Sequence, residues 1–126
     1  MYGYKKETDL PYEKAVEKTR EELKKEGFGV LTEINVKATL KKKLDVDIDN
    51  YMILGACNPP NAYKAIQAEQ DIGLMLPCNV IVYEKAGKTS VSAIKPSIAM
   101  RMIDNDKLKT IADEIEKKLK KVIDSV

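Results

Sequence analysis

Four consecutive segments with the side-chain pattern of β-strands, placed between two long amphipathic helical segments, constrain the fold of this chain most strongly. Only turns and short helical insertions separate the four segments, whereas parallel strands need a full crossover connection. A short strand precedes the first helix. The order strand, helix, four strands, helix predicts an α+β protein with an antiparallel sheet of about five strands and two long helices packed on one face.

Changes in periodicity and capping residues set the expected boundaries. Residues 28–36 alternate with a period of two, whereas apolar residues from Leu108 to Val126 recur every three or four positions, as on one face of a helix. Thr8 and Asp9 before Pro11 predict a capped helix start, and Gly27 predicts the end of that helix. The expected strands are residues 2–6, 28–36, 51–57, 79–84 and 88–94, and the expected helices are 10–26, 37–44, one that begins after Asn58, and 108–126.

The 126 residues fit a single domain, 1–126, without an obvious linker. The helix after Asn58 is expected to begin with two prolines and to bury a narrow stripe of Ala62, Ala65 and Ile66. Asp45, Asp47 and Asp49 are spaced like the opening of a calcium-binding loop, but the glycine and glutamate that such a loop requires are missing. We therefore interpret the three aspartates as a solvated loop.

The two central segments, residues 51–57 and 79–84, are apolar on both faces. An antiparallel sheet that is covered on one side normally alternates apolar and polar residues. Because the two long helices can bury only one face, the second face must meet the inserted helix, another subunit or a ligand. A homodimer is the economical solution.

Composition excludes several classes of function. Histidine is absent, so neither a Ser-His-Asp nor a Cys-His mechanism can operate within this chain, and His-ligated zinc or haem is also excluded. The net charge of +2 is too small to suggest a nucleic-acid or membrane partner. No membrane span or signal peptide is apparent, so a cytoplasmic location is expected. The 33% charged residues suit a thermophilic host or simply a very soluble surface. No cofactor and no reaction is indicated.

Two cysteines mark the candidate site. Cys57 and Cys78 each lie at the end of an apolar run. Asn58 and Pro59 follow Cys57, and Asn79 follows Cys78. In an antiparallel pairing these strand ends meet at the same edge of the sheet, so the thiols are expected to be near neighbours. They could act in redox exchange or bind a soft metal, and Cys57 precedes a helix N-terminus. Alternatively, they are inert cysteines that fill the core or line a pocket.

Glu33 is a further candidate, because it lies in the middle of a strand with apolar neighbours. It is expected to face away from Phe28, Val30 and Ile34. If the second face of the sheet is buried, this carboxylate would have a raised pKa and could anchor a ligand. The alternative is an ion pair with a lysine at the sheet edge. Lys41, Lys42 and Lys43 are too few, and too close to acidic residues, to predict nucleic-acid binding.

Three motifs in order resemble the bacterial and archaeal family known as domain of unknown function 302. They are residues 27–40 (GFGVLTEINVKATL), residues 54–60 (LGACNPP) and residues 76–80 (LPCNV), and the resemblance covers nearly the whole chain. It implies a fold similar to the TATA-box-binding-protein class, with a curved antiparallel sheet around a long helix, often as a homodimer. It implies no reaction.

Two hypotheses on function follow. The first is a small homodimeric binding module with a small-ligand pocket between sheet and helices, edged by Cys57, Asn58 and Cys78. The second is a thiol-based redox or soft-metal-binding protein that uses Cys57 and Cys78, with Glu33 as a neighbour.

Overall fold

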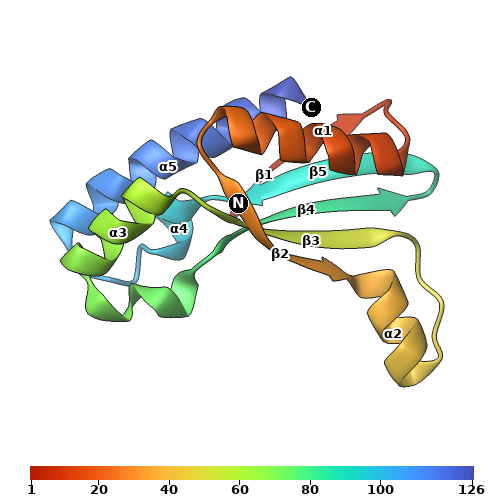
Figure 1. The fold of residues 1–126 in the computed structure, drawn as a ribbon, viewed down its shortest axis with the longest axis horizontal. Helices are drawn as coiled ribbons and strands as arrows, with labels where there is room; N and C mark the ends of the chain where they lie inside the picture. Colours follow the sequence, from red (N-terminus) through yellow and green to blue (C-terminus); the bar gives the residue numbers. More distant parts are fainter.

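The computed structural model describes residues 1–126 and is built on one five-stranded sheet in the order β1-β5-β4-β3-β2 (Figure 1). Every neighbouring pair of strands is antiparallel. The expected α+β class and sheet type are therefore confirmed. The strands are β1 (Gly3–Thr8), β2 (Gly29–Asn35), β3 (Tyr51–Cys57), β4 (Cys78–Lys85) and β5 (Lys88–Ile94).

Two long helices, α1 (Tyr12–Lys25) and α5 (Asp106–Ser125), cover one face of this sheet (Figure 1). Every second residue of the three inner strands points to them, as the pleat of a β-strand requires. The expected apolar stripe of α5 is confirmed, since most of it is buried. The core between helices and sheet includes Leu23 of α1, Leu119 and Ile123 of α5, and Leu54, Val80, Val82, Val91 and Ala93 of the sheet.

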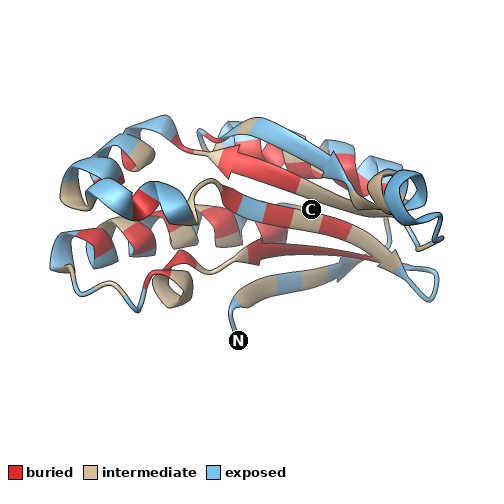
Figure 2. Cartoon of the chain, turned by 90° about the horizontal axis from the view of Figure 1, so that it is seen from below, coloured by how far each residue is buried: buried red, intermediate tan, exposed pale blue.

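The other helices lie at the two ends of the sheet (Figure 1). Towards one end, α3 (Pro59–Ala68), the 3-10 helix η1 (Gln70–Met75) and α4 (Pro96–Ala99) pack with α5 around a smaller core that contains Ile72 and Leu108. At the other end, α2 (Val36–Leu44) projects from the sheet. No helix crosses the second face, which Figure 2 shows from below. The inserted helix is thus excluded as the partner of the second face, and another subunit or a ligand remains.

At α1, the predicted capping side chain at the start is wrong, whereas the predicted glycine at the end is correct. The N-cap residue is Pro11 itself and no side chain caps this helix, so the predicted cap by Thr8 or Asp9 is wrong. The Thr8 hydroxyl instead accepts a hydrogen bond from the N–H of Leu10, two residues on, and stabilises the turn before the helix. Gly27 ends the helix as expected, with a φ of 83°, which a residue without a side chain adopts at no steric cost.

β2 departs from the regular alternation expected from its sequence. The register with β3 shifts between Val30 and Thr32, so Leu31 is the extra residue of a β-bulge. Past the bulge, each side chain points to the face opposite to the one that regular alternation from Val30 would give it. Glu33 therefore lies on the same side as Val30, across from Leu54, and the expectation that it faces away from Val30 is wrong.

The buried stripe of α3 also differs from expectation. Asn61 and Ala65 are the buried residues, whereas Ile66 is exposed. This helix packs beside α5 beyond the end of the sheet, so its inner side is set by α5 rather than by its most apolar stripe. The three loop aspartates are solvated as expected, and two of them, Asp45 and Asp47, pair with Lys41.

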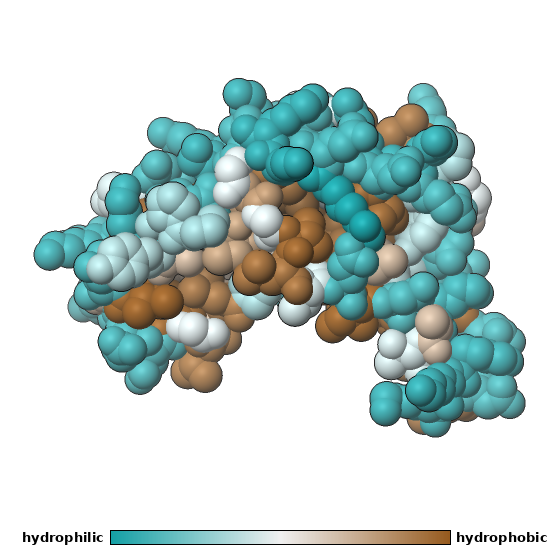
Figure 3. Space-filling view, viewed as in Figure 1, coloured by the Kyte–Doolittle hydropathy of each residue, from teal (hydrophilic) through white to brown (hydrophobic).

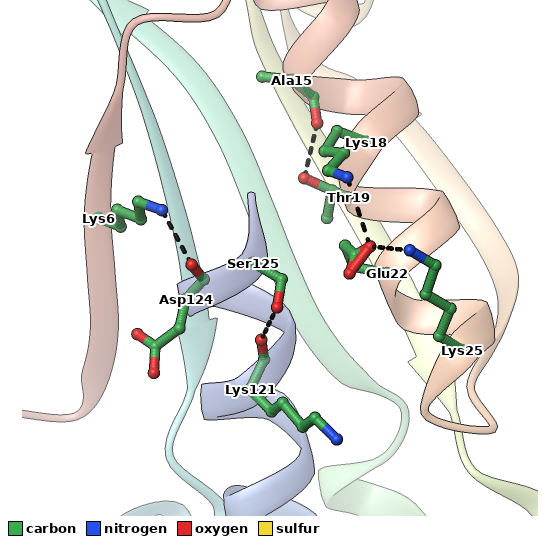
Figure 4. A network of polar contacts seen from close by, with 9 residues as sticks. All are labelled: Lys6, Ala15, Lys18, Thr19, Glu22, Lys25, Lys121, Asp124 and Ser125. Atoms are coloured by element: carbon green, nitrogen blue, oxygen red, sulfur yellow. Dashed lines mark hydrogen bonds and ion pairs between the residues drawn. The ribbon is translucent and has the colours of Figure 1, made fainter.

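Polar contacts hold the C-terminal end of α5 to β1 and satisfy a buried hydroxyl within α1 (Figure 4). Lys6 of β1 donates a hydrogen bond to the carbonyl oxygen of Asp124 at 3.0 Å, and the Tyr4 hydroxyl donates to the Asp124 carboxylate at 2.7 Å. Within α1, the buried Thr19 hydroxyl donates to the Ala15 carbonyl at 2.7 Å, so it is satisfied inside the core. β1 is thereby attached to the end of α5 as well as to β5.

The hairpin between β4 and β5 generates a prediction. Its two loop residues, Ala86 and Gly87, have φ values of 52° and 77°, as in a type I′ turn, for which asparagine followed by glycine is preferred. Ala86→Asn is expected to raise the free energy of unfolding by about 0.5–1 kcal/mol, because alanine is strained in the left-handed region. Ala86→Val should lower it. Urea unfolding measures both, and equal stability of the asparagine variant and the wild type would contradict the assigned turn.

Candidate functional site

The predicted corner forms where β3 ends and β4 begins. Ala56 pairs with Cys78 across the two strands, and Cys57 and Cys78 both line one small cavity. The expected proximity of the two thiols is therefore confirmed. Both cysteines are free; Cys78 is buried and Cys57 is half-buried.

The cavity at this corner is too small for a small-molecule ligand. Its volume is about 20 Å³, room for one water molecule, and Phe28, Leu76, Pro77 and Ile115 fill the surrounding space. Sites for small molecules usually measure about 300–1,000 Å³. The structure therefore gives no support for the predicted ligand pocket between sheet and helices, because core side chains occupy that space.

The electrostatics of the corner oppose thiolate formation at Cys78. Burial, together with the neighbouring Cys57, raises the pKa of the Cys78 thiol to about 11. The start of α3 also offers few donors: Pro59 has no N–H, and the N–H of Asn61 is already donated to Asn58. No group of three or more His, Cys, Asp or Glu residues is arranged to hold a metal ion.

Asn58 is engaged in holding the corner together. Its side-chain oxygen caps α3 by accepting from the N–H of Asn61 at 3.4 Å, as predicted from the sequence. Its amide group donates to the carbonyl oxygen of Glu26 at 3.2 Å and thus connects α3 to the end of α1. Both the oxygen and the amide group of the side chain are hydrogen-bonded, and only 8% of the residue is exposed. These structural bonds account for an asparagine at position 58.

The two other candidates lie away from the cavity. Asn79 is exposed on the uncovered face of the sheet, across from Gly55. Glu33 forms an ion pair with Arg20 of α1. The predicted alternative of an ion pair is therefore correct, but the partner is an arginine and not a lysine. The sequence-predicted set is thus divided among a filled corner, an open face and a sheet edge.

A large hollow lies on the uncovered face of the sheet. We call it the open-face groove; its volume is about 570 Å³. Because side chains on one face alternate along each strand, the pairing places Lys5, Ser92, Ile81, Ile53 and Ile34 in one row across all five strands. The groove is lined by Met1, Tyr2, Gly3, Lys5, Ile48, Asp49, Tyr51, Ile81, Tyr83, Glu84, Lys85 and Ser92.

An aromatic pair and a cation shape this groove. The rings of Tyr51 and Tyr83 stack with centroids 5.4 Å apart, and the Lys5 ammonium lies 5.6 Å from the centre of the Tyr83 ring. The nearby Lys5 ammonium lowers the pKa of the Tyr83 hydroxyl, and the same contact raises the pKa of Lys5. Ser90 and Ser92 are buried between them although they lie on the uncovered face. The groove therefore combines the tyrosine pair and Ile81 on β3 and β4 with the Lys5 ammonium and the Ser92 hydroxyl on β1 and β5.

Sequence reasoning did not select Lys5, Tyr51 or Tyr83 as site residues. The only available signal was that β3 and β4 are apolar on both faces, which indicates an occupied second face but not the part played by β1. Lys5 enters the groove because β1 pairs with β5, and a strand order of this kind cannot be read from local sequence.

Asn58 generates the first prediction from this site. Asn58→Ala is expected to lower the free energy of unfolding by about 2 kcal/mol, since it removes a helix cap and an interhelical hydrogen bond of about 1 kcal/mol each. Asn58→Ser retains a cap oxygen but cannot reach Glu26, so it should lose about half as much. Asn79→Ala, at the exposed asparagine, is the matched control and should change stability by less than about 0.5 kcal/mol. Equal losses for all three variants in urea unfolding would contradict this role.

The Cys78 thiol generates the second prediction. In the Cys57→Ser variant, iodoacetamide should alkylate folded protein slowly at neutral pH and rapidly in urea, because Cys78 is buried and protonated. Its raised folded-state pKa adds stability that is fully present below pH 9 and is lost as pH rises through about 11. Rapid labelling of the folded variant at neutral pH would contradict an inert Cys78.

Comparison with known proteins places the chain in a family. No curated protein matches it significantly. The profile of the domain of unknown function DUF302 matches residues 4–126. The chain is also similar to the crystal structure of an uncharacterized conserved DUF302 protein from Bacillus stearothermophilus, with 33% sequence identity, a TM-score of 0.94, and coverage of 99% of this chain and 98% of that one. None of the helices in the structure is long and apolar enough to cross a membrane. The chain belongs to the DUF302 family.

Proposed function

We propose that the protein is a homodimeric binding module that holds a small molecule in the open-face groove. The observation that carries this proposal is the combination in one hollow of a stacked tyrosine pair and a lysine ammonium. The binding function expected from the sequence is kept, and its site moves from the cysteine corner to the opposite side of the sheet.

The size of the groove supports binding of a small molecule. Its volume of about 570 Å³ falls within the usual range for such sites, whereas the cavity beside the cysteines does not. The floor consists of Ile81 and Ser92 on the central strands β4 and β5, which the core on the other face holds in place. A rigid floor reduces the entropy that is lost when a ligand binds.

The chemistry of the lining selects the kind of ligand. The stacked pair of Tyr51 and Tyr83 offers apolar area and suits a flat ring, which prefers offset or edge-on contact with aromatic side chains. Lys5 and Ser92 offer donors on the other side. Of the two acidic residues of the lining, Glu84 already accepts a hydrogen bond from the amide of Asn50 at 2.6 Å. A flat apolar molecule that carries an anionic group fits this division best.

This proposal is tested with 8-anilinonaphthalene-1-sulfonate, an aromatic anion whose fluorescence rises on binding. We expect the wild-type protein to bind the probe and Tyr83→Ala to weaken binding about tenfold, since aromatic contacts of this kind contribute roughly 1 kcal/mol or more. Tyr63→Ala is the matched control, because Tyr63 is an exposed tyrosine on α3 outside the groove. Native mass spectrometry of freshly purified protein would show a ligand that co-purifies.

Circular dichroism must first show that both variants are folded. Absence of probe binding to the wild type, or equal binding by the Tyr83 and Tyr63 variants, would overturn the groove as the binding site. Lys5→Gln separates the two halves of the site, because it should weaken binding of the sulfonate while leaving the tyrosine pair in place.

A further inference from the structure

The segment formed by residues 29–50 is ordered into a strand and a helix but contains no buried residue. It comprises β2, α2 and the loop that follows, and it accounts for 22 consecutive positions. Its apolar side chains include Leu31, Ile34, Leu44 and Val46, which are 66%, 46%, 66% and 42% exposed. Figure 3 shows apolar surface in the middle of the molecule, where β2 lies in Figure 1. Regular structure with so little burial normally packs against something else.

β2 is one of the two edge strands, and its outer backbone groups have no strand partner. The other edge strand, β1, carries Lys5, Lys6 and Glu7, and charged residues of this kind discourage pairing with another chain. β1 is also attached to the end of α5 through the Lys6 hydrogen bond. β2 has no comparable protection along its length, apart from its bulge.

Charge also favours contact at β2. The strand carries one charged residue, Glu33, which is already paired with Arg20 of its own chain. Two copies of the strand itself therefore meet without unpaired like charges. The exposed Leu31 and Ile34 would then add apolar contact beside the hydrogen-bonded backbones.

The helix α2 points to the same conclusion. It has nine residues and none of them is buried, whereas helices shorter than about 12 residues are marginal in water unless tertiary packing supports them. Asn35 caps its first turn through a hydrogen bond to the N–H of Ala38. A cap of this kind adds only about 1 kcal/mol. Packing against a second chain would add further support.

We infer that two copies of this chain associate through β2, which joins their sheets into one ten-stranded antiparallel sheet with α2 beside the junction. A twofold axis brings identical strands together antiparallel, which is the arrangement of every other strand pair in this sheet. Seven residues of β2 provide an edge roughly 23 Å long. The inference names the surface of the homodimer proposed above and does not depend on the ligand, since the open-face groove lies on the face of the sheet and not at this edge.

The first test is the molar mass in solution, measured by light scattering after size exclusion at several concentrations. The wild type should have twice the chain mass of 14.2 kDa. Leu31→Lys and Ile34→Lys should weaken self-association about a hundredfold or more, because each places two charges in the contact and removes apolar area. Leu74→Lys is the matched control on η1, where Leu74 is 90% exposed, and it should remain dimeric.

Hydrogen exchange provides a second test that does not depend on a substitution. Outward-facing amides of β2 should exchange more slowly as protein concentration rises, whereas those of β1 should not change. A monomeric wild type would overturn both the homodimer and this surface but leave ligand binding intact. A dimer that survives Leu31→Lys and Ile34→Lys, without protection of β2, would overturn the surface alone.

Discussion

Burial of the helix-facing side of β3, β4 and β5 under α1 and α5 is the interaction on which the rest of the structure depends. Leu54, Val80, Val82, Val91 and Ala93 are at most 1% exposed there, and each large one contributes about 1.5–3 kcal/mol by leaving water. Because side chains alternate along a strand, a register shift of one residue would expose this whole set. The register is thereby fixed, and so is the composition of the opposite face. The apolar residues of that face are therefore not needed for the core.

A close approach at Gly55 limits what the second face can contain. A Cβ atom at this position would lie 2.1 Å from the Thr32 hydroxyl oxygen and 2.9 Å from a ring carbon of Pro77, so only glycine fits without displacement of its neighbours. The space above the sheet near the cysteine corner is therefore occupied by β2 and by the segment before β4. The open hollow begins further along the strands, at Ile81 and Tyr83. This explains why the corner and the groove are separate places although β3 and β4 belong to both.

The elements with strong periodicity could be predicted from the sequence. Features that depend on packing between distant segments could not. β3 and β5 have the predicted bounds, because turn residues and a helix cap delimit them on both sides. The bulge at Leu31 has no local signature, since its neighbours alternate on either side of it. The exposure of Ile66 depends on where α3 meets α5. The cysteine corner was located correctly from antiparallel geometry, but whether a corner is hollow depends on how Phe28 and Ile115 fill it.

Sheet edge and sheet face give this small fold two independent surfaces. Strand pairing at β2 uses backbone groups in the plane of the sheet, whereas the groove uses side chains that stand perpendicular to it. The first leaves the second accessible, because widening a sheet does not cover its face. In the dimer inferred here, the twofold axis would place one groove on each half of a continuous sheet. Lys5 and Tyr83 lie on strands two or more removed from β2, so their contact would be the same in monomer and dimer.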